Sequence, residues 1–143
     1  MSNTIEQRLF YMQSKIEKLK ISLNKYHTFL AKNEVDNIYL ALKAVERDCE
    51  EIVESAVRIN QEILETHLEY IAQTYRESFE KLNEFSIFDT DTLKKLSNTT
   101  GFRNRLAHDY MDLDDNIVIK TGELIVVLYS QYILKIDSFI KES

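Results

Sequence analysis

The first third of the chain repeats apolar residues at alternating steps of four and three positions. Such a heptad seam lines one face of a helix, and here Lys and Glu occupy the other faces. The seam consists of Ile5, Leu9, Met12, Ile16, Leu19, Leu23, Tyr26 and Leu30. We therefore predict a long first helix that ends near residues 31–33.

The same spacing returns after a short polar interruption. The second seam consists of Val35, Ile38, Leu42, Val45, Cys49, Ile52, Ala56, Ile59 and Ile63. Two long seams with a very short connection predict an antiparallel helical hairpin. Val53, Val57 and Leu64 broaden the second stripe, so this helix should contact more than one neighbour.

Two further helices are expected before the end of the chain becomes strongly apolar. A third helix is predicted from about Leu68 to Phe85, followed by a loop over 86–90. Asp89, Thr90 or Asp91 can cap a fourth helix that runs to about Tyr110.

A polar break over 112–116 precedes a last helix, predicted from about Ile117 to Ile140. Its core candidates are Ile117, Ile125, Leu128, Tyr132, Ile136 and Phe139. No linker or repeat interrupts the pattern, so we expect one all-α domain over 1–143, an up-and-down bundle of four to five helices.

Composition agrees with long helices, because the chain has no proline and two glycines. The single cysteine, Cys49, excludes an internal disulfide and fits a reducing cytoplasm. No uninterrupted apolar run approaches the roughly 20 residues that span a bilayer. The N-terminus has no basic-then-apolar signal pattern. We expect a cytoplasmic protein with no membrane partner.

Net charge limits how the protein could hold a nucleic acid. The formal charge of −6 has the wrong sign for binding over a broad surface. Any RNA contact should therefore be local, carried by a small basic cluster such as Arg103 and Arg105. The same acidity suits a partner with a basic docking face.

The stretch Gly101–Tyr110 carries the candidate chemistry. It gathers Arg103, Asn104, one of three histidines (His108) and Tyr110 into eight residues. Phosphodiester cleavage uses such groups: a cation for the charged transition state, an imidazole for proton transfer, and an amide to orient.

Helical geometry decides which of these groups share a face. On an ideal helix, Arg103 and Tyr110 fall within about 20° of one another, and Asn104 and His108 lie about 40° apart. Arg103 and His108 are separated by roughly 140°, so they converge only if the Arg103 side chain curls around or something concave covers the helix. A neighbouring subunit would provide that concavity.

Proton transfer also favours two copies of the motif. Attack by a 2′-hydroxyl needs a general base, and the departing 5′-oxygen needs a general acid; one imidazole cannot readily be both at once. A two-fold dimer would supply two His108 side chains and two Arg103 guanidiniums. Our hypothesis is that Arg103 clamps the scissile phosphate while Asn104 orients His108 or a phosphate oxygen.

Other readings of these residues remain open. Arg103 could pair with Asp109 or Asp112, and Arg105 could contact RNA or be solvated surface. His27 and His67 lie on other helices and are expected to be structural or exposed, and Cys49 is expected in the core. No His/Cys ligand spacing or glycine-rich phosphate loop is present, so no metal or cofactor is expected.

The spacing Arg-x4-His-x-Tyr after Gly-Phe resembles the signature of the HEPN ribonucleases, and most closely the HepT toxins that partner MntA-type minimal nucleotidyltransferases. The resemblance covers the whole chain and implies a dimerising HEPN bundle with Arg103 and His108 as the catalytic pair. It implies a metal-independent ribonuclease toxin of a type II or type VII toxin–antitoxin system, cutting or trimming tRNA or mRNA. It also implies an antitoxin that binds the toxin, or transfers AMP to Tyr110, or does both.

The competing hypothesis is a non-catalytic HEPN module used for dimerisation or for binding a nucleotidyltransferase. The acidic charge favours this alternative. The complete Arg-Asn-His-Tyr set disfavours it.

Overall fold

The computed structural model describes residues 2–108 and 114–142, with side chains for residues 4–101 and 114–142. Within these residues the protein is built from helices, with no strand. The elements are α1 (Ser2–Ala31), α2 (Val35–Leu68), α3 (Tyr75–Glu80), the 3-10 helix η1 (Lys81–Phe85), α4 (Thr90–His108) and α5 (Asp115–Glu142). The predicted all-α fold is confirmed.

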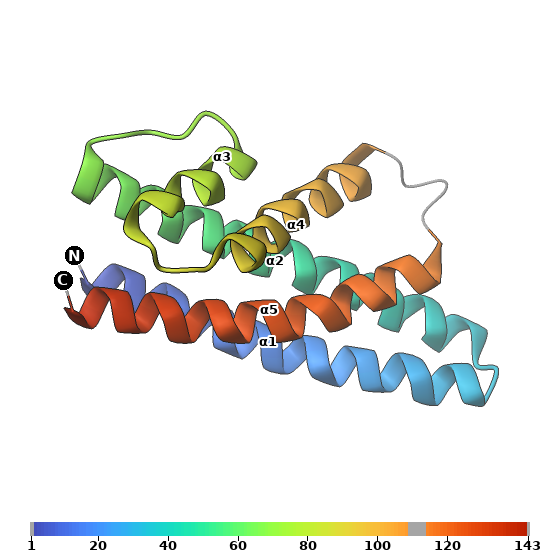
Figure 1. Ribbon diagram of the computed structural model, residues 1–143. Helices are drawn as coiled ribbons and strands as arrows, with labels where there is room; N and C mark the ends of the chain where they lie inside the picture. The colour runs from blue at the N-terminus through green and yellow to red at the C-terminus, as the bar shows by residue number, and fades with distance from the viewer. Residues whose placement is uncertain (1, 109–113, 143) are drawn as a thin grey trace.

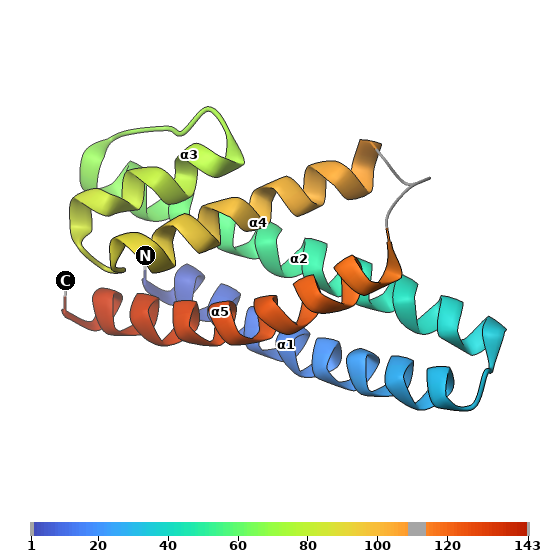
Figure 2. The same ribbon diagram turned by 45° about the vertical axis from the view of Figure 1, so that its right-hand side comes forward.

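The long helices form a bundle in which successive members run in opposite directions (Figure 1). α1 and α2 make the predicted antiparallel hairpin, and α5 packs along both of them. α3, η1 and α4 lie together on one side of these three helices, as both views show (Figure 2). α2 contacts α1, α3, α4 and α5, as its broad apolar stripe predicted.

The seam of α1 forms much of the core. Its members from Ile5 to Tyr26 are buried, but Leu30 is 48% exposed, so its predicted core position is wrong. Val35, which opens the second seam, is likewise exposed. Both residues flank the tight hairpin connection, where Asn33 has φ 56°. This connection extends beyond the ends of the other described helices (Figure 1).

α5 packs closely against the hairpin near its start. A Cβ on Gly122 would lie 3.1 Å from Val45 Cγ1 and 3.2 Å from Leu23 Cδ2, so glycine allows the approach. Ile125, Leu128, Tyr132 and Ile136 are buried as predicted, whereas Ile117 is 43% exposed and is not a core residue.

α5 is also the one helix, among the residues described, that is long and apolar enough to cross a membrane. The apolar residues of α5 do not form an uninterrupted run, because Lys120 and Glu123 lie among them. One apolar face of α5, which includes Ile125 and Tyr129, packs into the core of the bundle. Core packing therefore accounts for much of its apolar character.

The third helix is shorter than predicted. α2 continues to Leu68, Glu69 turns the chain with φ 50°, and α3 begins only at Tyr75. The Gln61 side chain holds the intervening loop, because it accepts from Ala72 N and donates to Ala72 O, both at 3.1 Å. This contact bridges distant positions and has no local sequence signal.

A buried polar network joins three helices in the core. The Tyr132 hydroxyl of α5 lies 2.6 Å from Asn60 Oδ1 and 3.1 Å from Ala56 O, both on α2. Asn60 Nδ2 donates in turn to Ser78 Oγ of α3 at 3.3 Å. Buried polar groups are costly when unpaired, so these bonds fix how the three helices pack together.

Candidate functional site

The motif helix α4 begins at a side-chain cap. Asp89 Oδ1 accepts a hydrogen bond from Thr92 N at 2.7 Å, which confirms Asp89 as one of the three predicted caps. The hydrogen bond from the Thr92 backbone lowers the pKa of Asp89, because it favours the carboxylate. The start of α4 is therefore defined before the chain reaches the motif.

The middle of α4 is anchored to α5 through the core. Thr99 Oγ1 and the Tyr129 hydroxyl lie 2.7 Å apart, and both residues are buried. Thr99 Oγ1 also donates to Leu96 O at 2.6 Å, so its single proton is used and Tyr129 is the donor between the two. Burial raises the pKa of Tyr129, which keeps the phenol protonated for this bond.

A second anchor ties α4 to α3. Arg76 Nη1 donates to Asn98 Oδ1 at 3.2 Å and to Ser97 Oγ at 3.4 Å. Leu93 and Leu96 are buried on the same helix. The part of α4 that precedes the motif is thus held from two sides.

The motif occupies the last two turns of α4. Arg103, Asn104, Arg105 and His108 all lie within the helix, which continues to His108. Their side chains and the whole of Tyr110 lie outside the described part of the structure. The continuity of the helix supports the spacing argument, and the convergence of the side chains stays a prediction.

The helix places the two predicted catalytic positions on different faces. Arg103 follows the buried Leu96 by seven positions, so its Cα lies within about 20° of the stripe that faces the core. His108 follows Gly101 by seven positions and Lys94 by fourteen, on the stripe where Lys94 is exposed. A Cβ on Gly101 would meet no heavy atom within 4 Å, so this stripe borders open space within one chain.

The other candidate nucleophile and bases serve structural roles in the part that is described. Cys49 is fully buried in the core, as predicted, and burial raises the pKa of its thiol. His67 packs edge-on against Phe85 and Phe139, with ring centroids 5.5 and 5.4 Å away. His27 is exposed on α1.

No group of three His, Cys, Asp or Glu side chains among the described residues is arranged to hold a metal ion. The predicted chemistry on α4 calls for none, since it relies on imidazole and guanidinium groups. The side chains of the motif are not among these described residues.

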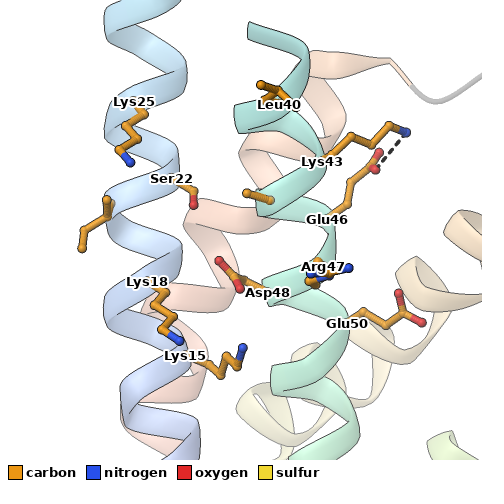
Figure 3. A pocket seen from close by; sticks show the side chains of 12 residues that line it. Lys15, Lys18, Ser22, Lys25, Leu40, Lys43, Glu46, Arg47, Asp48 and Glu50 are labelled. Carbon is orange, nitrogen blue, oxygen red and sulfur yellow. Dashed lines mark ion pairs between the residues drawn. The ribbon is translucent and has the colours of Figure 1, made fainter. Parts of the chain in front are cut away.

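Sequence reasoning missed a basic groove between α1 and α2, with a volume of about 810 Å³ (Figure 3). Three lysines of α1, Lys15, Lys18 and Lys25, line one side of it. Their spacing of three and seven places them on one helical face, which is a signal that the sequence does contain. They were treated only as the solvated side of a heptad seam.

Comparison with known proteins agrees with the motif. The family described as ribonuclease HepT-like matches residues 12–136. The chain is similar to the tRNA nuclease HepT of Aphanizomenon flos-aquae (strain 2012/KM1/D3), with 30% identity over 95 residues. That alignment covers 66% of this chain and 65% of the relative, so the chain matches just under two thirds of the relative's length.

Solved structures share the fold. A tri-AMPylated HEPN toxin of Shewanella oneidensis, in complex with its MNT antitoxin, superposes with a TM-score of 0.70 at 21% identity, covering 96% of this chain and 99% of the toxin. A toxin–antitoxin structure with AMP-PNP gives a TM-score of 0.70 at 20% identity, covering 89% and 97%.

The family match spans most of the chain, and the solved toxins have the same helical architecture. The signature at the end of α4 is the one from which the sequence predicted this membership. The chain belongs to the HepT-like ribonuclease family and has the HEPN fold.

Proposed function

We propose that this protein is the toxin of a type II or type VII toxin–antitoxin system and acts in the cytoplasm as a metal-independent ribonuclease. Its substrate would be tRNA or mRNA, which it cuts or trims. The observation that carries the proposal is the complete Arg103–His108–Tyr110 signature of the sequence, whose Arg103 and His108 lie in the last turns of an anchored helix in a HepT-like chain. The name of the relative, a tRNA nuclease, supports the same activity.

The proposed reaction is an internal transfer at phosphorus. One neutral His108 accepts the proton of a ribose 2′-hydroxyl, and the 2′-oxygen forms a bond to the adjacent phosphorus. The bond from phosphorus to the 5′-oxygen breaks, and the protonated His108 of a second copy donates its proton to that oxygen. The products are a 2′,3′-cyclic phosphate and a free 5′-hydroxyl.

Arg103 stabilises the charge that develops on the phosphoryl oxygens, through forked and charge-assisted hydrogen bonds. Asn104 orients His108 or a phosphate oxygen, and Arg105 contacts the RNA beside the scissile bond. Arg103 and His108 lie on different faces of one helix, so a second copy completes the site.

The exposed apolar residues of α5 support such a dimer. Ile117, Leu124, Val127 and Leu134 are between 43% and 70% exposed, and they follow one another at steps of seven, three and seven. These steps keep them within about 100° on the helix. α5 packs beside α4, so a second copy seated on this stripe would lie next to the motif.

We further propose that a nucleotidyltransferase antitoxin neutralises the toxin by binding it, by AMPylating Tyr110, or by both. In the transfer, the Tyr110 oxygen attacks the α-phosphorus of ATP, pyrophosphate leaves, and the phenolic proton passes to solvent. On an ideal helix Tyr110 would share the stripe of Arg103, so the negatively charged phosphodiester would occupy Arg103 and repel RNA. The AMPylated toxin among the similar structures supports this mode of control.

The decisive experiment compares histidine variants in cells and in vitro. Expression of the wild type should arrest growth, and purified protein should cleave RNA in EDTA to give cyclic-phosphate ends. His108→Ala and Arg103→Ala should lose both effects. His27→Ala is the matched control, because His27 is exposed on α1 and should keep full activity. An active His108→Ala protein would refute the proposal.

The second candidate is a HEPN module that binds the nucleotidyltransferase without cutting RNA. The net charge of −6 favours it, because a broad RNA-binding surface would be basic. A wild type that leaves growth and RNA intact, yet copurifies with the nucleotidyltransferase, would establish this alternative.

A further inference from the structure

The groove between α1 and α2 concentrates positive charge on a protein that is acidic as a whole. Its lining includes five cations and three carboxylates, whereas the full chain has 18 basic and 24 acidic residues. The cations are Lys15, Lys18, Lys25, Lys43 and Arg47. The groove lining therefore carries a net positive charge, the sign of an anion-binding surface, on a chain whose net charge is −6.

Two of these cations already have carboxylate partners, one outside the groove lining and one within it. Lys15 Nζ lies 2.6 Å from Glu51 Oε2, and Lys43 Nζ lies 3.2 Å from Glu46 Oε2. The pair of Lys43 and Glu46 lies on the side of α2 that faces away from α1 (Figure 3). These two lysines contribute less to any ligand than the cations that remain.

Lys18, Lys25 and Arg47 are exposed, and none has a carboxylate within 4 Å in the part of the chain that the structure describes. Lys18 and Lys25 are seven residues apart on α1, so they stand on one face about 10 Å from each other. Two cations on one face at this separation can contact phosphates that are not neighbours along a strand, whereas a single small anion would reach only one of them.

The floor of the groove opposes a deeply buried anion. Asp48 is 6% exposed and points towards α1 (Figure 3). Burial raises the pKa of Asp48, while the nearby Lys15 and Lys18 lower it. A carboxylate at the floor disfavours a phosphate pushed between the helices. A ligand that lies along the groove would therefore bind at its rim, within reach of the long cationic side chains.

The other lining residues indicate what kind of polyanion fits. None of the described residues that line the groove is aromatic, so there is no platform on which bases could stack. The apolar part of the wall comes from Ile21, Leu40 and Ala44. Such a surface recognises the sugar–phosphate backbone without reading its sequence.

The groove is also connected to the motif helix through α2. This helix contacts both α1 and α4. Glu50 leaves α2 on the side away from α1, whereas Asp48 points towards α1, and Arg47 leaves the helix between these two directions (Figure 3). A strand that passes over Arg47 would thus cross α2 in the direction of α4.

We propose that the α1–α2 groove holds the RNA backbone at a distance from the scissile bond, through phosphate contacts of Lys18, Lys25 and Arg47. This inference rests on the proposed ribonuclease function and extends it to how substrate is held. It also reconciles RNA binding with an acidic chain, because the groove gathers cations in addition to the small basic cluster of Arg103 and Arg105.

The test measures the salt dependence of RNA binding. Each phosphate contact with single-stranded nucleic acid contributes about −0.7 to the slope of log K against log salt. Anisotropy of a labelled single-stranded RNA, with the full chain carrying His108→Ala, gives this slope. Lys18→Gln combined with Lys25→Gln should make it less negative by about 1.4.

The matched control removes the same charge elsewhere. Lys20 and Lys141 pair with Glu17 and Asp137 on the surface, outside the groove. Lys20→Gln combined with Lys141→Gln should leave the slope unchanged. Equal shifts in both double variants, or no shift in the groove variant, would overturn the proposal. All four lysines are exposed, and matching melting curves will verify that both variants fold.

A kinetic readout separates this proposal from the ribonuclease assignment. With His108 intact, the groove variant should raise KM and leave kcat unchanged, since the substituted residues are remote from the reacting atoms. If the wild type cleaves RNA but the groove variant shows no change in the salt-dependence slope, the groove proposal is wrong and the ribonuclease proposal stands. If the groove variant shows the expected change in slope but the wild type does not cleave RNA, the ribonuclease proposal is wrong and RNA binding by the groove stands. A variant that loses the antitoxin but keeps the RNA slope would make the groove a protein-docking site and would overturn our inference.

Discussion

The Tyr129 hydroxyl donates a hydrogen bond of 2.7 Å to Thr99 Oγ1 inside the core, joining α5 to the motif helix nine residues before His108. Tyr129 has no other hydrogen-bond partner among the described residues, whereas Thr99 also bonds to Leu96 O. If this bond were removed, Thr99 Oγ1 would keep its hydrogen bond to Leu96 O, whereas the buried Tyr129 hydroxyl would have no partner among the described residues. In this sense the bond is asymmetric.

This asymmetry predicts unequal costs for removing the two hydroxyls. Tyr129→Phe should lower the free energy of unfolding by about 0.5–1.5 kcal/mol, the usual net value of a hydrogen bond. Thr99→Val should cost more, about 1–3 kcal/mol, because it leaves a buried phenol unpaired. Urea denaturation of both variants and of the double variant measures the coupling. Strictly additive effects would show that the two hydroxyls do not interact.

A surface cluster on the α1–α2 hairpin predicts how stability depends on pH. Glu51 accepts hydrogen bonds from Lys15 at 2.6 Å and from Tyr11 at 3.2 Å. Partial burial alone would raise the pKa of Glu51, but these bonds outweigh it and lower the pKa. A lowered pKa in the folded state stabilises the fold above the unfolded-state pKa of about 4.3, and the effect is lost as pH falls through the folded-state value.

Glu51→Gln should therefore make the free energy of unfolding depend less steeply on pH at acid pH. The wild type should lose more unfolding free energy than the variant between about pH 5 and pH 3, the range around the unfolded-state pKa. Glu17→Gln is the control, since the contacts that Glu17 makes with Lys20 and Gln13 are both exposed. If wild type and Glu51→Gln lost stability in parallel, the cluster would have no role in acid sensitivity.

The dimer proposal predicts that the α5 stripe holds two copies together. Val127→Glu places a charge among exposed apolar residues, so it should convert the dimer to monomer and reduce ribonuclease activity in parallel. Sedimentation and cleavage assays on the same preparation make the comparison. Ile71→Glu is the control, because Ile71 is similarly exposed, at 66%, but lies in the loop after α2. A folded Val127→Glu monomer with full activity would exclude the shared site.

Control by AMPylation predicts a single modified position. Mass spectrometry of the protein coexpressed with an MntA-type nucleotidyltransferase antitoxin should show AMP on Tyr110. Tyr110→Phe should lack the adduct and stay toxic unless the antitoxin also silences it by binding. An AMP adduct on the Tyr110→Phe protein would show that another residue is the acceptor.

The sequence predicted those features that depend on local periodicity. The seam of α1 and the cap at Asp89 were both found in this way, because each involves residues within one or two turns. The break between α2 and α3 was missed. Its signal was present, since Thr74 accepts from Glu77 N at 3.0 Å and Glu77 Oε1 accepts from Gln73 N at 2.6 Å, close to a capping box.

The features that escaped prediction depend on contacts between distant segments. Gln61 holds the loop before α3 through Ala72, and Tyr129 finds Thr99 thirty residues away. The groove is a similar case. The lysines of α1 form a basic groove only because the fold places Lys43 and Arg47 of α2 beside them. For the motif, the sequence supplied the residue types and spacing, and the fold supplied the helix that carries them.

Because α4 is anchored at Thr99, a small change of tilt there moves the backbone at the C-terminal end of the helix through a larger distance. From Thr99 to His108 the helix rises about 14 Å, so a tilt of only 5° at the anchor would carry the His108 backbone roughly 1 Å sideways. Misplacement on that scale can slow an enzyme about a hundredfold. Substitutions deep in the core that hardly alter folding would then reduce the proposed ribonuclease activity first, and weakened variants would arise far from the proposed RNA-contacting residues.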